Sequence, residues 1–287
     1  MNVYVLSHNG IGDNFFMIGA LNFLDKFYDN VFLICKARNN KHIAPFLISP
    51  SVNTVPLLLD ARDGFNEREN LTKFFNSNKH NHEYDLFVCG GHKSTFKSRI
   101  TNKEFLNCKK LDESYTIGYD TLNCKNYKFI KNFYNDMGLN LTHFYEFWHV
   151  SSTEESIRLF KLIDKYYIVF IQYKSSDNKV LNITNLVNKY INKSGTILIC
   201  NDKNLYEGGD QTNEKYKIAK LFVYNKFINY IDTIKNSDEI YIIDSSFTGI
   251  VLPLLKTNRL KAKIVRIIRR NIKKCVLLPT PTPKIKP

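Results

Sequence analysis

The sequence predicts an α/β protein made of two Rossmann-like domains that face a central cleft, each with a parallel sheet. Three observations lead to this prediction. Short apolar runs alternate with helix-periodic segments along the chain, which is typical of parallel sheets covered by helices. The alternation starts a second time near residue 150. The length of 287 residues lies near the size at which one hydrophobic core divides into two.

The first domain is expected over residues 1–150. The segment that starts at Phe15 (FFMIGALNFLDKFY) has the i, i+3, i+4 apolar spacing of a helix packed on a sheet. A further helix is expected around residues 125–137. The polar residues 61–83 and 93–120 are left open as loops or short helices. Strands are expected in four apolar runs, at residues 2–7, at 31–37, in the run that ends at Asp60, and at 84–91.

The second domain is expected over residues 151–278. Ser152 and Glu155 have the spacing of a capping box at the start of a helix. The proline-rich residues 279–287 are expected to be an extended tail. Strands are expected at residues 166–173, 195–202, 221–225, 239–243 and 263–268, with helices near 183–192, 213–220 and 227–236.

Composition narrows the class of protein. The sequence has no run of 18 apolar residues and no basic and apolar leader at its start, so a cytoplasmic protein that does not span a membrane is expected. Its six cysteines form no C-x-x-C pair, which fits buried thiols in a reducing compartment.

The formal net charge of +14 indicates an anionic partner, such as a nucleotide, a polyphosphate, a nucleic acid or an acidic membrane surface. Many of the basic residues lie in the stretch 256–274, where they alternate with Ile, Val and Leu. This stretch is either the solvated face of the last strand and helix or a surface for an acidic ligand or lipid.

The loop His8-Asn9-Gly10-Ile11-Gly12-Asp13 joins the first strand to the first helix. Its glycines permit a tight turn, and the helix N-terminus offers free N–H groups to a ligand. The third glycine of the dinucleotide fingerprint is replaced by Phe15, and the second strand ends in Cys35-Lys36 instead of an acidic residue, which disfavours NAD. Asp13 is therefore a ligand-facing carboxylate, a helix cap, or both.

A second group, Asp244-Ser245-Ser246-Phe247-Thr248-Gly249, follows a strand and precedes an apolar helix. Small hydroxyl residues and helix amides together form a phosphate cradle, although the same residues also cap ordinary helices.

Further candidates follow other predicted strands. One group, Gln172, Lys174 and Ser175, follows the first strand of the second domain. These residues either bind a diphosphate, whose charge the lysine would neutralise, or form a plain surface loop. Asp202 follows the next strand and suits a base or a ribose. His92 and Lys93, after Gly90-Gly91, either contact substrate or have a structural role. The sequence has no H-E-x-x-H, no D-x-D and no Cys/His cluster, so no metal and no other cofactor is expected.

These motifs resemble those of the heptosyltransferase-like family of GT-B glycosyltransferases. In that family a G-x-G-D loop follows the first strand, as Gly10–Asp13 does here, and an aspartate with a Ser/Thr/Gly cluster follows a late strand, as Asp244–Gly249 does. The family has a histidine shortly after that glycine, where this chain has Ile250-Val251-Leu252. Virus-type and fucosyltransferase-like enzymes carry a turn like Ser245-Ser246-Phe247, so the resemblance does not identify the sugar that is transferred.

The resemblance implies metal-independent transfer of a sugar from a nucleotide-sugar to a glycan or glycolipid hydroxyl in polysaccharide biosynthesis. Asp13 would be the general base. Residues 1–150 would bind the acceptor and residues 151–278 the donor. The implied donor-binding residues are Gln172, Lys174, Ser175, Asp202, Asp244, Ser245, Ser246, Thr248 and Gly249. The implied acceptor-side residues are His8, Asn9, Gly10, Gly12, His92 and Lys93.

Two other function classes stay open. One is a non-catalytic nucleotide- or glycan-binding module of the same fold, which donor hydrolysis would separate from an enzyme. The other is a basic nucleic-acid-binding protein, although the sequence contains no RNP or helix-turn-helix signature. A steep salt dependence of nucleic-acid binding would identify it.

Overall fold

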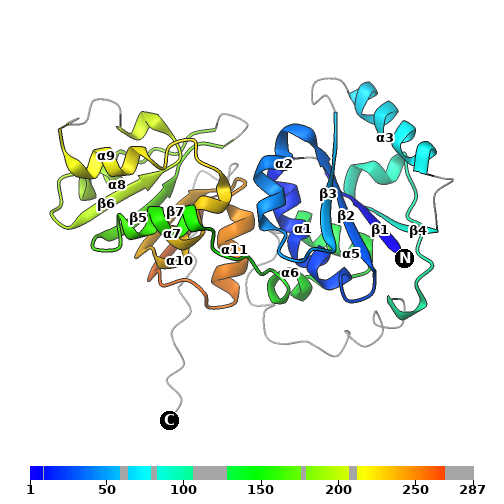
Figure 1. Ribbon diagram of the computed structural model, residues 1–287. Helices are drawn as coiled ribbons and strands as arrows, with labels where there is room; N and C mark the ends of the chain where they lie inside the picture. Colours follow the sequence, from blue (N-terminus) through cyan, green and yellow to red (C-terminus); the bar gives the residue numbers. More distant parts are fainter. Residues whose placement is uncertain are drawn as a thin grey trace, which may run out of the picture. The chain divides into compact units, whose positions relative to one another are not determined.

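The computed structural model describes residues 1–8, 10–58, 64–78, 83–105, 128–175, 179–206 and 212–268. The chain divides into two compact units, Met1–Ser151 and Ser152–Pro287. Each unit contains one four-stranded sheet whose neighbouring strands all run parallel (Figure 1). The predicted α/β fold with parallel sheets is therefore confirmed.

The sheet of the first unit has the strand order β3-β2-β1-β4. Its strands are β1 (Asn2–Leu6), β2 (Asn30–Lys36), β3 (Val52–Leu57) and β4 (Tyr84–Val88). The central strand β1 pairs with both β2 and β4, and Leu6 stands beside Val88. Val3, Val5 and Leu33 are fully buried, so the apolar runs of the sequence form the centre of this core.

The helix α3 covers one face of this sheet. Leu71 and Phe75, four residues apart on α3, pack in a cluster with Leu6, Ile34, Leu86 and Val88. This short apolar stripe anchors a helix whose other residues are mostly polar. Because the stripe is so short, the sequence pattern did not distinguish a helix from a loop at residues 61–83. The helical elements of the first unit that lie wholly within the described residues include α1 (Ile11–Leu24), α2 (Ala37–Ile43), η1 (Ala44–Phe46), α3 (Gly64–Asn78), η2 (Gly90–Ser94), α5 (Lys128–Met137) and α6 (Thr142–Glu146).

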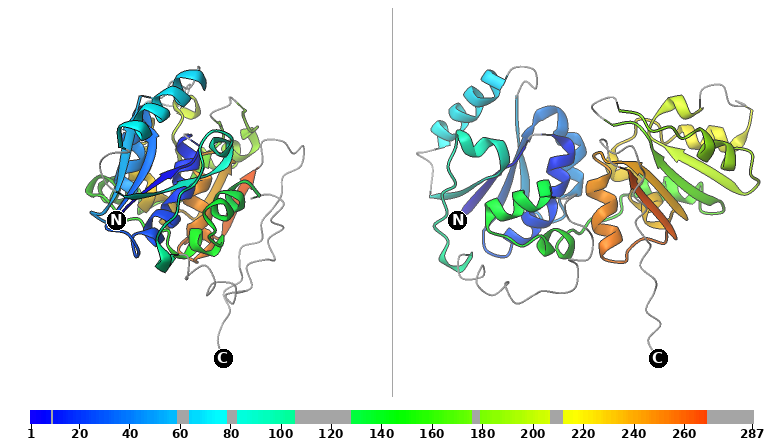
Figure 2. Two further views of the ribbon diagram at one scale, coloured as in Figure 1. Left: turned by 90° about the vertical axis from the view of Figure 1, so that its right-hand side faces the viewer. Right: turned by 180° about the vertical axis from the view of Figure 1, so that it is seen from behind.

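The sheet of the second unit has the order β6-β5-β7-β8, and β8 forms one of its edges (Figure 2). Its strands are β5 (Tyr167–Gln172), β6 (Thr196–Cys200), β7 (Glu239–Ile243) and β8 (Ile264–Ile268). In the central pair, Gln172 of β5 stands beside Ile242 of β7. The carboxyl ends of these two strands therefore lie next to each other.

Helices cover the second sheet. Tyr190 and Leu186 of α8 pack with Val169, Leu198 and Tyr241, whereas α10 packs on β5 and contacts α7 and α11. The helical elements of this unit are α7 (Glu154–Lys161), α8 (Thr184–Tyr190), η6 (Lys203–Tyr206), α9 (Glu214–Lys220), η7 (Phe227–Tyr230), α10 (Ile231–Asn236) and α11 (Thr248–Lys256).

The predicted cap of α7 is wrong by one residue. The backbone N–H of Ser156 donates to Thr153 Oγ1 (3.1 Å), so Thr153 is the N-cap. Ser152 Oγ instead donates to Asp232 Oδ1 (2.6 Å). The overlapping sequence Ser152-Thr153-Glu154-Glu155 offers two hydroxyls, and the contact with Asp232 leaves the second one to cap the helix.

The strand predicted at residues 221–225 is also wrong, because residues 221–224 form a turn. Tyr224 has a φ of 55°, which no strand accommodates. Phe222 is fully buried, and its ring lies 6.0 Å from that of Tyr230. The second sheet therefore has no strand beyond β6 among the described residues, and β6 forms its other edge.

Two side chains occupy the free edge of β6. The hydroxyl of Tyr206 accepts the N–H of Cys200 (2.8 Å) and donates to the carbonyl of Leu198 (3.1 Å). The ammonium of Lys215 donates to the carbonyl of Thr196 (3.2 Å). These bonds replace those of a neighbouring strand and block pairing of this edge with another chain.

Each sheet also has a buried carboxylate at the amino end of a strand. Asp85 of β4 is fully buried and accepts four hydrogen bonds, from Tyr28, from both donors of Thr101 and from the N–H of Asn102. Glu239 of β7 accepts from three tyrosines, Tyr167, Tyr190 and Tyr241. Burial raises the pKa of Glu239, but the three phenols outweigh burial and hold this pKa below its usual value.

In the part of the chain that the structure describes, no helix has both the length and the apolar character needed to cross a bilayer. The same residues contain no group of three or more His, Cys, Asp or Glu side chains placed to share a metal ion.

Replacing Tyr206 with Phe is expected to lower the free energy of unfolding by about 1–3 kcal/mol, because the buried N–H of Cys200 and the carbonyl of Leu198 lose their partner. Urea denaturation measures this change. The control is Tyr224→Phe, which removes an exposed hydroxyl and is expected to stay within about 0.5 kcal/mol of the unsubstituted protein. Equal stability of the two variants would contradict the role given to Tyr206.

Candidate functional site

The carboxyl edge of the first sheet joins two of the predicted loops. His8 follows β1, and Gly90-Gly91 follow β4. The N–H of Gly91 donates to His8 Nε2 (2.8 Å). Gly90 has a φ of 64°, and a Cβ at that position would lie 2.5 Å from His8 Nε2, so both the backbone and the available space require glycine. His92 lies in the same group, with its ring centroid 6.3 Å from that of His8.

Asp13 lies in the first turn of α1, after the N-cap Gly10. A Cβ on Gly10 would stand 2.5 Å from Asp13 Oδ2, so the carboxylate folds back over the loop. Gly12 lies in the same turn of α1. Asp13 therefore sits at a helix N-terminus and at the carboxyl edge of the sheet. The predicted residue Asn9 lies outside the described residues.

His92 and Lys93 each face a carboxylate. His92 Nε2 lies 3.4 Å from Glu67 Oε1, and Glu67 Oε2 lies 3.4 Å from Lys36 Nζ. Lys93 pairs with Asp136. The structure thus places His92 next to the ion pair of Lys36 and Glu67, whereas the charge of Lys93 is engaged by Asp136 of α5.

The helix α5 holds this edge together. The rings of Phe129 and Phe133 lie 5.3 and 5.1 Å from that of His8. Asp136 Oδ2 accepts the N–H of Gly90 (2.8 Å). Both loops of the edge therefore rest on the same helix.

A further contact of α5 enters the hydrogen-bond ladder of α1. The hydroxyl of Tyr134 donates to the carbonyl of Phe16 (2.8 Å) and accepts the N–H of Ala20 (3.1 Å). These two backbone groups are four residues apart and would otherwise bond to each other. Tyr134 is thus inserted into the helix whose first turn contains Asp13.

Four residues of this edge are not among those that the sequence pattern predicts: Lys36, Glu67, Tyr134 and Asp136. Glu67 and Asp136 belong to segments whose facing residues no local pattern marks. Asn14, next to Asp13, is also outside that prediction. It is fully buried, its Oδ1 lies 3.3 Å from Ser7 Oγ, and its Nδ2 has no hydrogen-bond partner among the described residues.

Burial lowers the pKa of both imidazoles at this edge. For His8, desolvation outweighs the opposing charges of Glu67 and Asp136. For His92, desolvation is joined by the charges of His8 and Lys36 and opposed by Glu67. Both rings are therefore neutral near pH 7, as His8 must be to accept the N–H of Gly91.

The carboxyl edge of the second sheet carries the predicted donor residues from its two central strands. Gln172 ends β5, and Asp244 and Ser245 follow β7. Gln172 Nε2 donates to the carbonyl of Lys174 (2.7 Å). Its buried Oε1 and the buried Oγ of Ser245 have no hydrogen-bond partner among the described residues. A buried polar atom without a partner costs free energy unless a ligand or water satisfies it.

The predicted phosphate cradle divides into a surface part and a buried part. Asp244, Ser245 and Ser246 are partly exposed, whereas Thr248 and Gly249 are buried in the first turn of α11. Thr248 Oγ1 accepts the N–H of Ser245 (3.1 Å). Thr248 therefore fixes the loop, and the hydroxyl of Ser245 is buried within it.

The remaining donor candidates lie in neighbouring loops. Lys174 forms an isolated antiparallel bridge with Val180, and the N–H of Ser175 donates to the carbonyl of Lys179 (2.9 Å). Asp202 follows β6 and accepts the N–H of Asn204 (2.9 Å), so its carboxylate also caps a turn. Lys174 and Gln172 are thus close together, whereas Asp202 belongs to the adjacent strand end.

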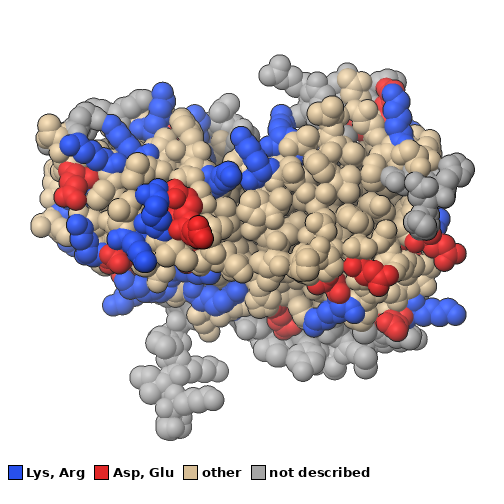
Figure 3. Space-filling model, in the orientation of Figure 1, with Lys and Arg blue, Asp and Glu red and all other residues tan. Residues whose placement is uncertain are grey.

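The two units differ strongly in charge. Residues 152–287 contain 24 Lys and Arg against 12 Asp and Glu, a formal charge of +12, whereas residues 1–151 contain 17 against 15, a charge of +2. Lysine and arginine side chains are spread over the second unit in the view of Figure 3. An anionic ligand is therefore attracted to the second unit more strongly than to the first.

The lowered pKa values of His8 and His92 predict a loss of stability in weak acid. Below about pH 6.5 the unfolded chain binds protons that the folded imidazoles do not, so the free energy of unfolding falls as the pH drops toward the lowered folded values. The slope stays below the limit of about 1.4 kcal/mol per pH unit and proton, because both rings are partly solvated. Urea denaturation between pH 7.5 and 5.5 measures it.

The matched variant is His8→Gln, whose amide oxygen keeps an acceptor for the N–H of Gly91 but does not titrate. The slope of stability with pH is expected to be smaller in this variant. An unchanged slope would contradict the neutral, accepting state of His8.

Comparison with known proteins identifies a similar fold among solved structures. No family model matches the chain, and no curated protein matches it in sequence. Among solved structures, ADP-heptose lps heptosyltransferase II of E. coli aligns with a TM-score of 0.50 and 9% identity over 94% of this chain and 84% of that one. A glycosyl transferase of family 9 from Veillonella parvula DSM 2008 aligns with a TM-score of 0.49 and 9% identity, over 93% and 79%. The predicted resemblance is therefore confirmed at the level of the fold, which this chain shares with a heptosyltransferase.

Proposed function

We propose that this chain is a glycosyltransferase of the two-domain GT-B type, which binds a nucleotide-sugar on its second unit and an acceptor on its first. The observation that carries the proposal is the pair of buried atoms without partners among the described residues, Ser245 Oγ and Gln172 Oε1. They lie at the ends of neighbouring parallel strands, where open α/β sheets bind ligands. The fold shared with heptosyltransferase II also supports it.

The two atoms suit a phosphorylated sugar or nucleoside. The hydroxyl of Ser245 donates to a phosphate oxygen. The N–H groups of Thr248 and Gly249 donate to the carbonyls of Ser245 and Ser246 (2.9 and 3.2 Å), so α11 contributes the positive end of its dipole. The Oε1 of Gln172 is an acceptor only, so it requires a ligand hydroxyl or amine. Lys174 offsets the charge that develops on the leaving diphosphate. In this mechanism the lysine and the dipole of α11 perform the role for which other transferases use a metal.

The proposed reaction is a direct displacement at the anomeric carbon, with the base on the first unit and the donor on the second. The acceptor oxygen attacks the anomeric carbon while its proton passes to the carboxylate of Asp13. The bond between that carbon and the diphosphate oxygen breaks, and the nucleoside diphosphate leaves with the electron pair. Asp13 then returns its proton to water. A carboxylate in this role contributes about 10²- to 10⁴-fold to the rate.

A second candidate function is a non-catalytic binding module of the same fold. The observation in its favour is the position of Asp13, whose carboxylate lies against Gly10 in the first turn of α1 and therefore suits a helix cap. Such a module would bind the nucleotide-sugar and leave it intact.

We also propose a cytoplasmic location and contact with acidic membrane lipids through the basic stretch 256–274. The buried thiols support a reducing compartment: burial raises the pKa of Cys35 to about 11 and that of Cys200 to about 12, which keeps them unreactive. Lys256, Arg259, Lys261 and Lys263 are the basic residues between 256 and 263. Residues 269–274 lie outside the described residues, as does the proline-rich tail.

Ser245→Ala tests the donor site. The variant loses a hydroxyl without a partner among the described residues, so the unliganded protein is expected to be as stable as before or slightly more stable. The rise in melting temperature caused by a nucleotide-sugar is expected to shrink, because affinity sets that rise. A thermal-shift panel of UDP-, GDP-, ADP- and CMP-sugars without added metal measures both effects. Ser94→Ala, which alters a hydroxyl of the first unit, is the control.

Absence of any nucleotide-dependent shift in the unsubstituted protein would overturn the donor site. If the rise in melting temperature were as large in Ser245→Ala as in the unsubstituted protein, Ser245 would not belong to the donor site.

Gly10→Ala tests the placement of Asp13 without removing it. The new Cβ would stand 2.5 Å from Asp13 Oδ2 and push the carboxylate aside, so kcat is expected to fall about tenfold or more while donor binding is kept. Asp13→Asn, which keeps the shape and removes the base, is expected to lower kcat about 10²- to 10⁴-fold. Full activity of Asp13→Asn would favour the capping role for this residue.

A further inference from the structure

The aromatic ring of Tyr224 is exposed near the end of β6. The side chain of Tyr224 is 68% exposed, more than any other aromatic side chain in the described residues. No ring contact or side-chain hydrogen bond joins it to another residue that the structure describes. Four of the eight other tyrosines of the second unit, Tyr190, Tyr206, Tyr230 and Tyr241, are buried.

The backbone of Tyr224 is strained. Its φ of 55° lies in the left-handed region, which bulky residues adopt rarely and which glycine or asparagine adopts readily. Strain of this kind persists where surrounding contacts impose it, and it occurs often at ligand sites. A tyrosine at this position therefore indicates a role for its ring.

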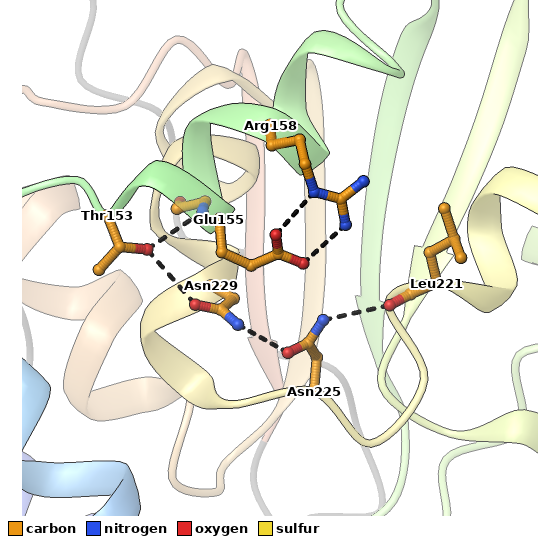
Figure 4. Close-up of polar contacts among 7 residues, drawn as sticks. Thr153, Glu155, Arg158, Leu221, Asn225 and Asn229 are labelled. Atoms are coloured by element: carbon orange, nitrogen blue, oxygen red, sulfur yellow. Dashed lines mark hydrogen bonds and ion pairs between the residues drawn. The ribbon is translucent and has the colours of Figure 1, made fainter.

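A polar network imposes the conformation of the turn (Figure 4). The amide of Asn225 donates to the carbonyl of Leu221 (3.1 Å), and the amide of Asn229 donates to Asn225 Oδ1 (2.7 Å). Thr153 Oγ1, beside the start of α7, contacts Asn229 Oδ1 (3.4 Å). The turn is thus tied at its base to two helical elements, α7 and η7, while the ring of Tyr224 is left exposed.

The turn lies at the carboxyl edge of the second sheet, where the proposed donor site is. The N–H of Tyr224 donates to the carbonyl of Asn201 (3.1 Å), and Asn201 directly follows β6. β6 is the neighbour of β5, which ends in Gln172. Tyr224 therefore stands at the same edge as the proposed donor site, and Lys226 follows it by two residues in the sequence.

We propose that Tyr224 is the platform on which the base of the nucleotide donor stacks. This inference rests on the proposed function and assigns the place where the base of its donor binds. A flat, exposed ring offers its face to any of the bases, because stacking is tolerant of base identity. Asp202 and the turn backbone are then left to distinguish one base from another.

The test measures the affinity of three variants for ADP, GDP and UDP and for inorganic pyrophosphate by calorimetry. Tyr224→Asn removes the ring and suits the backbone, so it is expected to keep or raise the melting temperature while weakening nucleotide binding about ten- to a hundredfold. Its affinity for pyrophosphate is expected not to change. Tyr224→Phe keeps the ring and is expected to bind within threefold of the unsubstituted protein. Leu221→Asn, at a 48% exposed position of the same turn, is the matched control and is expected to bind normally.

The proposal is overturned if Tyr224→Asn binds nucleotides normally or loses nucleotides and pyrophosphate equally. It is also overturned if the variant loses only binding to vesicles of anionic phospholipid, since the ring would then contact a membrane. Nucleotide binding that falls in Ser245→Ala but not in Tyr224→Asn would leave the proposed function intact and remove only the stacking role. Absence of nucleotide binding by the unsubstituted protein would overturn both.

Discussion

The in-register parallel pairing of β1 with β4 and of β5 with β7 is the constraint on which both candidate sites depend. Each pairing aligns two strand ends that are distant in the sequence, Leu6 with Val88 and Gln172 with Ile242. The loops that follow are thereby brought to one edge before any side chain interacts. In parallel sheets the helical crossovers enforce this alignment, because every strand must start again from the opposite edge.

The two edges differ in how fully their polar groups are satisfied. At the first edge, His8, Asp136 and Glu67 bind groups of the protein itself, α5 holds both loops, and one buried atom, Nδ2 of Asn14, has no partner among the described residues. At the second edge, the turn at Ser245 is held by Thr248, while atoms of Ser245 and Gln172 are left without partners among the described residues. The first edge is preorganised by its own contacts, whereas the second has buried polar atoms that a bound ligand would satisfy.

The sequence was sufficient to predict the elements whose apolar pattern is strong. The buried strands, the helix after His8 and the parallel α/β class follow from periodicity, and the loops with Asp13 and Ser245 follow from their place between strand and helix. Three kinds of feature could not be predicted from the sequence. The turn at Tyr224 occupies a β-rich run because Tyr206 and Lys215 cover the edge of β6 from elsewhere in the chain. The contacts of Glu67 and Tyr134 are tertiary, and no local pattern encodes them. The cap of α7 was missed because two adjacent hydroxyls compete for it.

The unequal charges of the two units have a kinetic consequence. With +12 on one unit and +2 on the other, the long-range field drives a polyanion toward the second unit before any contact forms. The encounter rate of such a ligand should therefore fall steeply as salt shortens the Debye length to about 8 Å at physiological ionic strength. Dissociation, which depends on short-range contacts, should respond much less. In a compartment of varying ionic strength, salt would thus control how quickly the second unit is occupied and have little effect on how long it stays occupied.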